Sequence, residues 1–516
     1  MCSETLHALL LMPFPVPSLL TRHRTSSVLR AVLLSLAILF LGACGSSREA
    51  PDFSRLYDRA AQYHGPERNP IILIPGILGS KLTHAPTGTT VWGAFSGGFA
   101  DPETPSGARK VALPMAAGQP LSSLRDSVKA DGALERVKVR VLGLPVKLDA
   151  YVEILQSLGI GGYRDETKAL SGVDYGDDHF TCFQFDYDWR RDNVENARRL
   201  HTFIEKKRDY VQQQYAERYG IDDYPVKFDI VAHSMGGLLT RYYLRYGTAD
   251  LSSASSEQEV PWTGTRYVES AVLVGTPNAG SVESLDQLVH GKHISRFVPD
   301  YPAALLGTMP SVYQLLPRPR HGAVVDGADS TAIDSLYQPS FWQRMEWGLA
   351  DPDQDAVLQT LLPTVDSRSE RRRIAVDHLE KSLRRAREFA RALDRPAPRP
   401  DSLDLKLIAG DAEPTPARME IDRTTGSLTP LDRAPGDGTV LRSSALMDER
   451  VGGEWAPTLV SPIDWSAVTF LFAEHVEMTS DPAFTDNLLY FLLVRPRQST
   501  RSSTLRPRPE VRQTGD

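Results

Sequence analysis

The stretch from Lys227 to Gly237 constrains the fold of this chain more than any other. An apolar run, Phe228 to Val231, leads into the turn Ala232-His233-Ser234-Met235-Gly236, and a helix-compatible segment follows at 238–244. Small residues at both ends of the turn let the chain fold back sharply, which lifts the Ser234 hydroxyl clear of a sheet. The N-terminus of the following helix offers backbone N–H groups to a developing negative charge. The segment therefore predicts a nucleophilic serine rather than an ordinary strand-to-helix turn.

This order of strand, tight turn and helix is typical of the nucleophile elbow of α/β-hydrolases, although their pentapeptide usually starts with Gly rather than Ala. Other apolar runs alternate with helical patterns, which predicts a doubly wound, mostly parallel sheet. From 282 to 400 the strand signal fades, so we expect an inserted cap or lid there. Weak periodicity between 92 and 145 suggests loops over the sheet. Strands are expected at 70–74, 180–187, 268–274 and 403–408, and helices at 151–158, after Asp192 and at 484–493.

A serine nucleophile needs a base, and the base needs an acid to hold it. In α/β-hydrolases the chain order is Ser, acid, His. Asp437 lies in a Gly-flanked turn after the last core strand, and His475 is the only histidine beyond it. Asp411, directly after that strand, is the alternative acid. His233 precedes the elbow turn and is expected to pack beneath Ser234.

The turn that follows the first strand, Pro75 to Ser80, occupies the place where hydrolases form the other half of the oxyanion hole. Backbone N–H groups do that work, so side-chain identity matters little there. We expect the amides of Ile77 and Met235 to bind the oxyanion, with Leu78 as the alternative to Ile77. A plain strand-ending turn is the simpler interpretation.

Within the expected cap, apolar residues recur every three or four positions from Val376 to Leu393, and arginines fill many of the other positions. Such a helix is either a lid that touches lipid or, more often, a helix that packs on the body with a solvated charged face. His378 lies on this helix and is expected at the surface.

The N-terminal segment predicts export. Arginines precede the apolar run 31–41, which is too short for a confident membrane span and ends in Leu41-Gly42-Ala43-Cys44. These residues resemble a bacterial lipobox, in which Cys44 carries lipid. Gly45 after the cysteine suggests an outer-membrane lipoprotein of the cell envelope. The alternative is an ordinary cleaved signal peptide. Cys182 then has no partner within the chain, so we expect no intramolecular disulfide.

Composition narrows the function further. A formal net charge of −7, spread over a mixed chain, argues against nucleic acid as the main partner. A hydrophobic content of 41% supports a large core but not a polytopic membrane protein. The sequence contains no HExxH, no paired CxxC and no P-loop, so it predicts neither a metal site nor a nucleotide cofactor. The oligomeric state leaves no signal in the sequence.

Taken together, these motifs resemble the lecithin:cholesterol acyltransferase family, which includes lysosomal-type phospholipases and bacterial relatives. The resemblance implies a triad of Ser234, Asp437 and His475 that acts on lipid acyl esters. The chain lacks the paired cysteines that close the lid loop of the animal enzymes. The motifs that carry the resemblance are 70–82, Tyr187-Asp188-Trp189-Arg190, Ala232-His233-Ser234-Met235-Gly236-Gly237, Gly275-Thr276-Pro277, Val312-Tyr313-Gln314-Leu315-Leu316-Pro317, Gly436-Asp437-Gly438-Thr439-Val440 and His475.

The sequence thus predicts an enzyme that forms an acyl-enzyme on Ser234 and passes the acyl group to water or to another alcohol. A different class of function is a catalytically silent envelope lipoprotein that binds acyl chains or a protein partner. The expected organisation is a lipoprotein signal peptide at 1–43, a tether at 44–69, the two parts of the hydrolase core at 70–281 and 401–495, the cap or lid at 282–400 and a disordered tail at 496–516.

Overall fold

Strands and helices alternate along the chain as the apolar pattern predicts. The computed structural model describes residues 57–93, 98–133, 136–141, 144–149, 151–251, 259–292 and 299–494. The expected signal peptide, Cys44, most of the tether and the expected C-terminal tail lie outside the described residues. Within the described part of the chain, no helix is long and apolar enough to cross a membrane.

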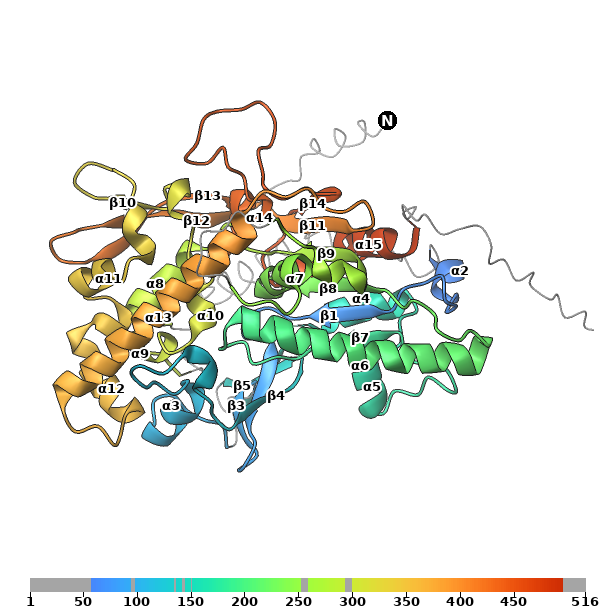
Figure 1. Cartoon of the computed structure of the whole chain (residues 1–516), viewed down its shortest axis with the longest axis horizontal. Coiled ribbons are helices and arrows are strands. Elements are labelled where there is room, and N and C mark those ends of the chain that lie inside the picture. Colours follow the sequence, from blue (N-terminus) through green and yellow to red (C-terminus); the bar gives the residue numbers. More distant parts are fainter. Residues whose placement is uncertain are drawn as a thin grey trace, which may run out of the picture. The chain divides into compact units, whose positions relative to one another are not determined.

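A six-stranded sheet forms the centre of the fold, in the order β14-β11-β9-β8-β1-β7 (Figure 1). All of its neighbouring strands pair in parallel, which confirms the predicted doubly wound α/β fold. Strand β7 is shorter than the apolar run 180–187 suggests. The strands are β1 (Ile71–Ile74), β7 (Cys182–Gln184), β8 (Phe228–His233), β9 (Val268–Val274), β11 (Asp404–Gly410) and β14 (Ala467–Leu471).

Side chains of the central strands alternate between two cores, one on each face of the sheet. Ile72 and Ile74 of β1 join the core that contains helices α6 (Asn193–Tyr219) and α7 (Met235–Tyr246). Ile71 and Leu73 join the core that contains α4 (Val152–Ile160) and α15 (Pro482–Leu489). A parallel sheet covered on both faces needs mostly apolar side chains. This need explains why the strands are largely apolar; the buried Asp229 of β8, which accepts a hydrogen bond from Asn69, is an exception.

The long helix α6 begins where its capping residue predicts. The Asp192 carboxylate accepts a hydrogen bond from the backbone N–H of Val194, 3.1 Å away. The helix ends at Gly220, whose φ of 62° is a left-handed conformation that favours glycine. Both ends therefore follow from local sequence.

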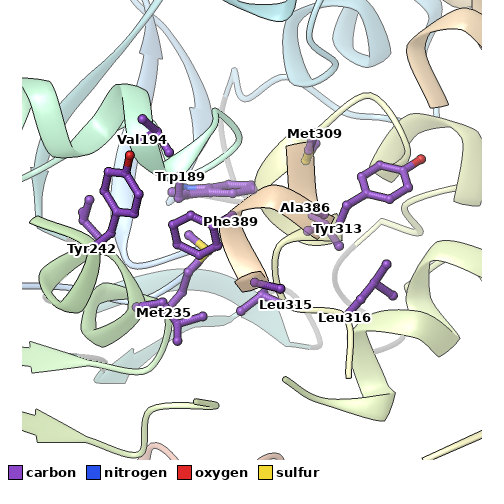
Figure 2. Close-up of a cluster of buried hydrophobic side chains, with 14 of the residues drawn as sticks. Trp189, Val194, Met235, Tyr242, Met309, Tyr313, Leu315, Leu316, Ala386 and Phe389 are labelled. Carbon is purple, nitrogen blue, oxygen red and sulfur yellow. The ribbon is translucent and has the colours of Figure 1, made fainter. Parts of the chain in front are cut away.

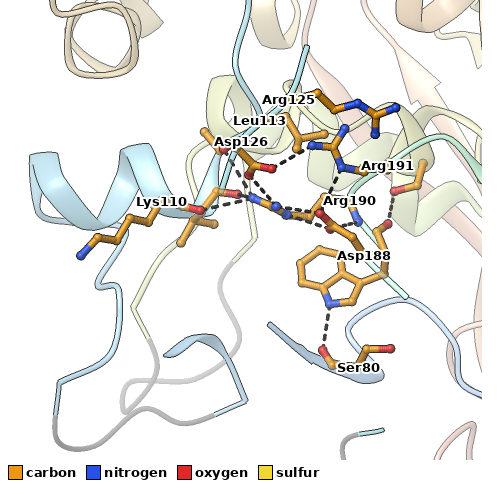
Figure 3. A network of polar contacts seen from close by, with 12 residues as sticks. Ser80, Lys110, Leu113, Arg125, Asp126, Asp188, Arg190 and Arg191 are labelled. Carbon is orange, nitrogen blue, oxygen red and sulfur yellow. Dashed lines mark hydrogen bonds and ion pairs between the residues drawn. The ribbon is translucent and has the colours of Figure 1, made fainter. Parts of the chain in front are cut away.

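The motif Tyr187-Asp188-Trp189-Arg190 follows β7 and forms a buried ion network (Figure 3). The fully buried Arg190 guanidinium lies 2.7 Å from carboxylate oxygens of both Asp188 and Asp126. It also donates to the backbone carbonyl of Val111, 2.9 Å away. Because these groups come from separate segments, the network fixes the stretch 111–126 against the end of β7.

The stretch 92–145, expected to be loops, contains regular structure. Helix α3 (Pro105–Val111) is followed by strand β4 (Val128–Ala133), which pairs with β2 (Ser80–His84). On its other side β2 pairs with β3 (Thr89–Trp92). A further hairpin joins β5 (Arg136–Val141) and β6 (Leu144–Asp149). In β4 the side chains are half-buried or exposed, so the hydrophobic alternation that marks a strand is weak.

The segment expected to form a cap is mainly helical in its described part. Its helices are α8 (Val282–His290), α9 (Ala303–Leu306), α10 (Pro310–Tyr313), α11 (Pro339–Met345), α12 (Asp355–Leu361) and α13 (Arg368–Asp394). The short strand β10 (Val324–Asp326) pairs with β12 (Glu413–Ile421), which pairs with β13 (Leu428–Gly436). Outside this segment lie the further helices α2 (Asp58–Ala61), α5 (Glu166–Leu170) and α14 (Arg442–Leu446) and the π-helical turn Tyr490–Val494. The remaining short turns are 3₁₀ helices at Leu121–Ser123, Thr263–Arg266, Pro319–His321, Asp334–Tyr337, Gly348–Ala350, Pro352–Gln354 and Glu477–Ser480.

The apolar stripe of α13 packs on the body of the protein, and Leu379 and Leu383 have no exposed surface. Figure 2 shows Ala386 and Phe389 of α13 in a cluster with side chains of α7; Phe389 stacks on Tyr242 with ring centroids 5.5 Å apart. Of the two interpretations of this helix, the structure favours packing over an open lid.

The expectation that His378 lies at the surface is wrong. His378 is only 1% exposed, and its Nε2 lies 3.0 Å from the carbonyl oxygen of Thr308. It occupies the buried face because it lies between Ala375 and Ser382 at helical spacing, and both of these residues are buried as well.

Candidate active site

Ser234 lies at a sharp turn between β8 and α7. Its backbone has a φ of 52° and a ψ of −125°, which a residue with a side chain seldom adopts. Glycines make the turn possible: a Cβ atom added at Gly236 would lie 2.5 Å from the carbonyl oxygen of Pro75, and one at Gly237 would lie 1.9 Å from Oγ1 of Thr276. The local sequence thus produces the strand–turn–helix geometry that its small residues predict.

The structure brings Ser234, His475 and Asp437 together in one series of hydrogen bonds. Nε2 of His475 lies 3.0 Å from Oγ of Ser234, and Nδ1 lies 2.8 Å from Oδ2 of Asp437. The carboxylate accepts a hydrogen bond from the N–H at Nδ1, so Nε2 carries the lone pair that can accept the serine proton. This is the hydrogen-bond pattern that a base needs beside a serine nucleophile.

Asp437 is held firmly in this position. It is 1% exposed, and its Oδ1 accepts hydrogen bonds from the backbone N–H groups of Thr439 and Val440, at 3.0 and 2.6 Å. Its backbone carbonyl accepts from the N–H of His475 at 2.8 Å. The Gly-flanked turn therefore fixes both the carboxylate and the histidine that it contacts.

Two glycines at the ends of neighbouring strands leave room for these side chains. A Cβ atom added at Gly275, after β9, would lie 3.0 Å from Cε1 of His475. One added at Gly410, the last residue of β11, would lie 2.7 Å from Cβ of Asp437. In open α/β sheets the site forms at the carboxyl ends of the strands. The sequence analysis singled out neither glycine for this role, since only the packed sheet shows what each one faces.

The alternative acid, Asp411, has other contacts. Its Oδ2 lies 3.3 Å from Nη1 of Arg442, and its backbone N–H bonds the carbonyl of Leu471. The geometry at His475 therefore favours Asp437 over Asp411.

The turn after β1 lies directly against the serine. A Cβ atom added at Gly76 would lie 2.7 Å from Cβ of Ser234. Leu78 adopts a φ of 64°, and its carbonyl accepts a hydrogen bond from Nε1 of Trp92 at 2.6 Å. Ile77, in this turn, and Met235, the first residue of α7, are the residues expected to contribute the oxyanion amides. In the described part of the chain, no hydrogen bond to protein engages either of these amides.

His233, expected beneath the nucleophile, is 5% exposed and lies beside His475, with ring centroids 4.8 Å apart. Burial, together with a smaller effect of the neighbouring His475, lowers the pKa of His233 to about 3. His233 is therefore neutral at physiological pH. Among the described residues, no group of three His, Cys, Asp or Glu side chains is placed to hold a metal ion.

Comparison with solved structures identifies the class of protein. The crystal structure described as the Tle4–Tli4 complex matches with a TM-score of 0.51 at 16% identity, over 82% of this chain and 98% of that one. Lipase 1 from Pelosinus fermentans matches at 13% identity with a TM-score of 0.31, over 83% and 99% of the two chains. The phospholipase PlaB from Legionella pneumophila matches at 13% identity with a TM-score of 0.29, over 67% and 57%. The sheet, the elbow and the first of these likenesses show an α/β-hydrolase fold.

A second comparison concerns the family. The model of the lecithin:cholesterol acyltransferase family matches residues 131–356, a region that is less than half of the chain and contains Ser234. This part of the chain is thus similar to that family, which confirms the resemblance predicted from its motifs. No curated protein matches the sequence significantly.

Proposed function

We propose that this chain is a serine-dependent lipid acyl hydrolase or acyltransferase that works through an acyl-enzyme on Ser234. The observation that carries the proposal is the unbroken series from Oγ of Ser234 through His475 to Asp437, at 3.0 and 2.8 Å. The family match supports a lipid acyl ester as the substrate. The alternative, a silent lipoprotein, has no need for a buried carboxylate that orients a histidine toward an elbow serine.

In the proposed reaction, Oγ of Ser234 attacks the carbonyl carbon of the ester while Nε2 of His475 takes the hydroxyl proton. The tetrahedral intermediate then expels the alcohol, which receives that proton from His475, and the acyl group stays on Ser234. Water or a second alcohol next attacks the acyl-enzyme by the same steps in reverse. Asp437 stays ionised throughout and stabilises the imidazolium.

The oxyanion formed in both steps needs hydrogen-bond donors that are already in place. We assign this role to the backbone amides of Ile77 and Met235, with Leu78 as the alternative to Ile77. The contact of Gly76 with Ser234 supports the assignment, because it brings this turn against the attacking oxygen. The positive end of α7 adds to the stabilisation.

Two measurements test the proposal. A fluorophosphonate probe should label the wild-type protein and should not label Ser234→Ala. Products from a panel of phospholipids and neutral esters, with and without added alcohol, then identify the lipid and show whether water or an alcohol takes the acyl group. A folded wild-type protein that is neither labelled nor active on any of these esters would favour the silent lipoprotein.

We also propose that the chain is an envelope lipoprotein anchored through Cys44, a residue outside the described structure. The supporting observation is the sequence Leu41-Gly42-Ala43-Cys44 after a short apolar run. Cys44→Ser should abolish lipid attachment and leave precursor or a soluble form, as detected by fractionation and by mass spectrometry of the N-terminus. Release of the wild-type protein from the envelope without detergent would contradict the anchor.

A further inference from the structure

A second series of hydrogen bonds runs beneath the proposed triad and uses none of its side chains. The backbone N–H of Gly76 lies 2.8 Å from the hydroxyl of Tyr151, and that hydroxyl lies 3.1 Å from Nδ1 of His233. On the other side of the ring, Nε2 of His233 lies 3.2 Å from the carbonyl oxygen of His475. The series thus joins the turn after β1 to the backbone of His475.

The direction of every bond in this series is fixed by its two ends. The Gly76 amide can only donate, so the Tyr151 oxygen accepts there and its proton goes to Nδ1 of His233. The carbonyl of His475 can only accept, so Nε2 of His233 carries the proton of the imidazole. A neutral His233 meets both demands with one tautomer, whereas a charged ring has no lone pair for the Tyr151 hydroxyl.

The two side chains of the series, Tyr151 and His233, are both buried. Tyr151 is 6% and His233 5% exposed, and their rings meet edge to face with centroids 5.4 Å apart. Tyr151 also fills the space beside the turn: a Cβ atom added at Gly79 would lie 2.6 Å from its hydroxyl oxygen. A shift of Tyr151 would therefore displace the turn that contains Ile77 and Gly79.

We propose that Tyr151 and His233 are positioning residues, which hold the oxyanion turn and the backbone of His475 at a fixed distance across Ser234. The proposal rests on the proposed function, because it assigns these residues to the same reaction. The attacking oxygen, the base and the oxyanion donors must be aligned together, and a misplacement of about 1 Å can cost on the order of a hundredfold in rate. The series connects two of these three partners without touching the substrate.

The test compares replacements of His233 that differ only in hydrogen bonding. His233→Gln keeps one acceptor and one donor at the tip of the side chain, whereas His233→Leu has a similar size and neither. In His233→Leu we expect kcat for a p-nitrophenyl ester to fall ~10- to 100-fold, with KM changed less than about twofold. The rate of fluorophosphonate labelling should fall in parallel. His233→Gln should recover most of both rates.

Tyr151→Phe removes the hydroxyl alone and tests the other half of the series. It should lower kcat and the labelling rate by ~3- to 30-fold, again with little change in KM. Tyr242→Phe is the matched control, because Tyr242 is likewise buried and its hydroxyl is likewise hydrogen-bonded, here to the backbone carbonyl of Ala249 at 2.8 Å. Tyr242 lies eight positions along α7 from Ser234, and its variant should keep wild-type kcat.

Each outcome decides between positioning and plain stability. If Tyr151→Phe loses kcat and labelling rate as expected while its circular dichroism spectrum matches that of the wild type, the hydrogen-bond series positions the oxyanion turn and His475. Wild-type kcat and labelling in folded Tyr151→Phe and His233→Leu would overturn the proposal, and so would equal losses in His233→Gln and His233→Leu. An unlabelled, inactive wild-type protein would instead contradict the proposed function itself. Should His233→Leu fail to fold, Tyr151→Phe and its Tyr242→Phe control still decide.

Discussion

At the scale of single residues, the proposed nucleophile Ser234 has an unfavourable backbone conformation. A non-glycine residue at positive φ costs on the order of 1–3 kcal/mol, which surrounding structure must offset. Here the close packing of Gly236 and Gly237 on their neighbours holds the turn in place. The strained turn places Oγ of Ser234 at the end of β8, 3.0 Å from Nε2 of His475.

This strain predicts an unusual result for a nucleophile replacement. Ser234→Gly should be more stable than Ser234→Ala by ~1 kcal/mol, because glycine adopts the φ of 52° without a Cβ clash. The difference is measured as the free energy of unfolding in urea for the two inactive variants. Equal stabilities would show that the turn carries no strain.

The choice of acid gives a second prediction at this scale. Asp437→Asn should lower kcat roughly 10⁴-fold, because an amide in that place no longer holds the tautomer that leaves Nε2 free. Asp411→Asn is the control, and its kcat should fall less than about threefold, since Asp411 pairs with Arg442 instead of with His475. Steady-state kinetics on one ester checks both variants. A larger loss in folded Asp411→Asn would reverse the assignment of the acid.

The sequence predicts the three side chains of the proposed triad but not what surrounds them. Ser234, Asp437 and His475 follow from chain order and turn chemistry, which are local properties. Tyr151 is the N-cap residue of α4, 83 positions before Ser234, and no local pattern links the two. Its role depends on how α4 packs under β1 and β8, which only the folded sheet determines.

At the scale of elements, α13 connects the segment expected to form a cap with α7, the helix that follows the proposed nucleophile Ser234. Leu383 has no exposed surface and lies in the large core that also contains α7. Leu383→Ala should lower the free energy of unfolding by ~2–5 kcal/mol, through lost burial and the cavity left behind. Arg387→Ala, on the exposed face of the same helix, is the matched control and should change stability by less than about 0.5 kcal/mol. Both are measured by urea unfolding, and similar losses in the two variants would contradict the buried interface.

The network around Arg190 stabilises a different connection, that of the stretch 111–126 with the end of β7 (Figure 3). Asp188→Asn removes one of the two carboxylates that neutralise a fully buried guanidinium. Leaving such a charge partly unpaired costs about 3–5 kcal/mol. We expect the free energy of unfolding of Asp188→Asn, measured in urea, to fall by this amount. The control Asp131→Asn affects an exposed pair with Lys81 and should cost less than about 1 kcal/mol.

Elements differ in how well their sequence predicts them. The central strands are continuous apolar runs because both faces of the sheet are covered, and they were predicted nearly to the residue at β1 and β9. The strand β4 was missed because its side chains are half-buried or exposed and no strong pattern marks them. His378 was wrongly predicted at the surface because the prediction rested on its polar residue type. Its helical spacing from the buried Ala375 and Ser382 is what places it on the buried face.

At the scale of the whole molecule, buried neutral histidines couple the fold to pH. Burial lowers the pKa of His233 to about 3 and that of His378 to about 4, from an ordinary value of 6.5. Between pH 6.5 and about pH 4 the folded state keeps both rings neutral, while the same two histidines take up protons in the unfolded chain. The unfolded state then binds more protons, so the free energy of unfolding falls as the pH drops from 6.5 toward 4.

We predict that the free energy of unfolding falls by ~1.4 kcal/mol for each such histidine with every unit that the pH drops, once the pH is well below 6.5. His378→Gln removes one of them while its amide can still donate to the carbonyl of Thr308, so its free energy of unfolding should fall less steeply by about one proton. Urea unfolding at several pH values between 7 and 4.5 measures the slope. His290→Gln is the control of opposite sign, since the hydrogen bond that the His290 ring donates to the Asp286 carboxylate raises the pKa of His290. The stability from that bond is present below pH 6.5 and is lost as the pH rises through the folded pKa, so this variant should not flatten the acid slope. An unchanged slope in His378→Gln would mean that the ring takes up a proton without loss of the fold, and that the burial of α13 is looser than the structure shows.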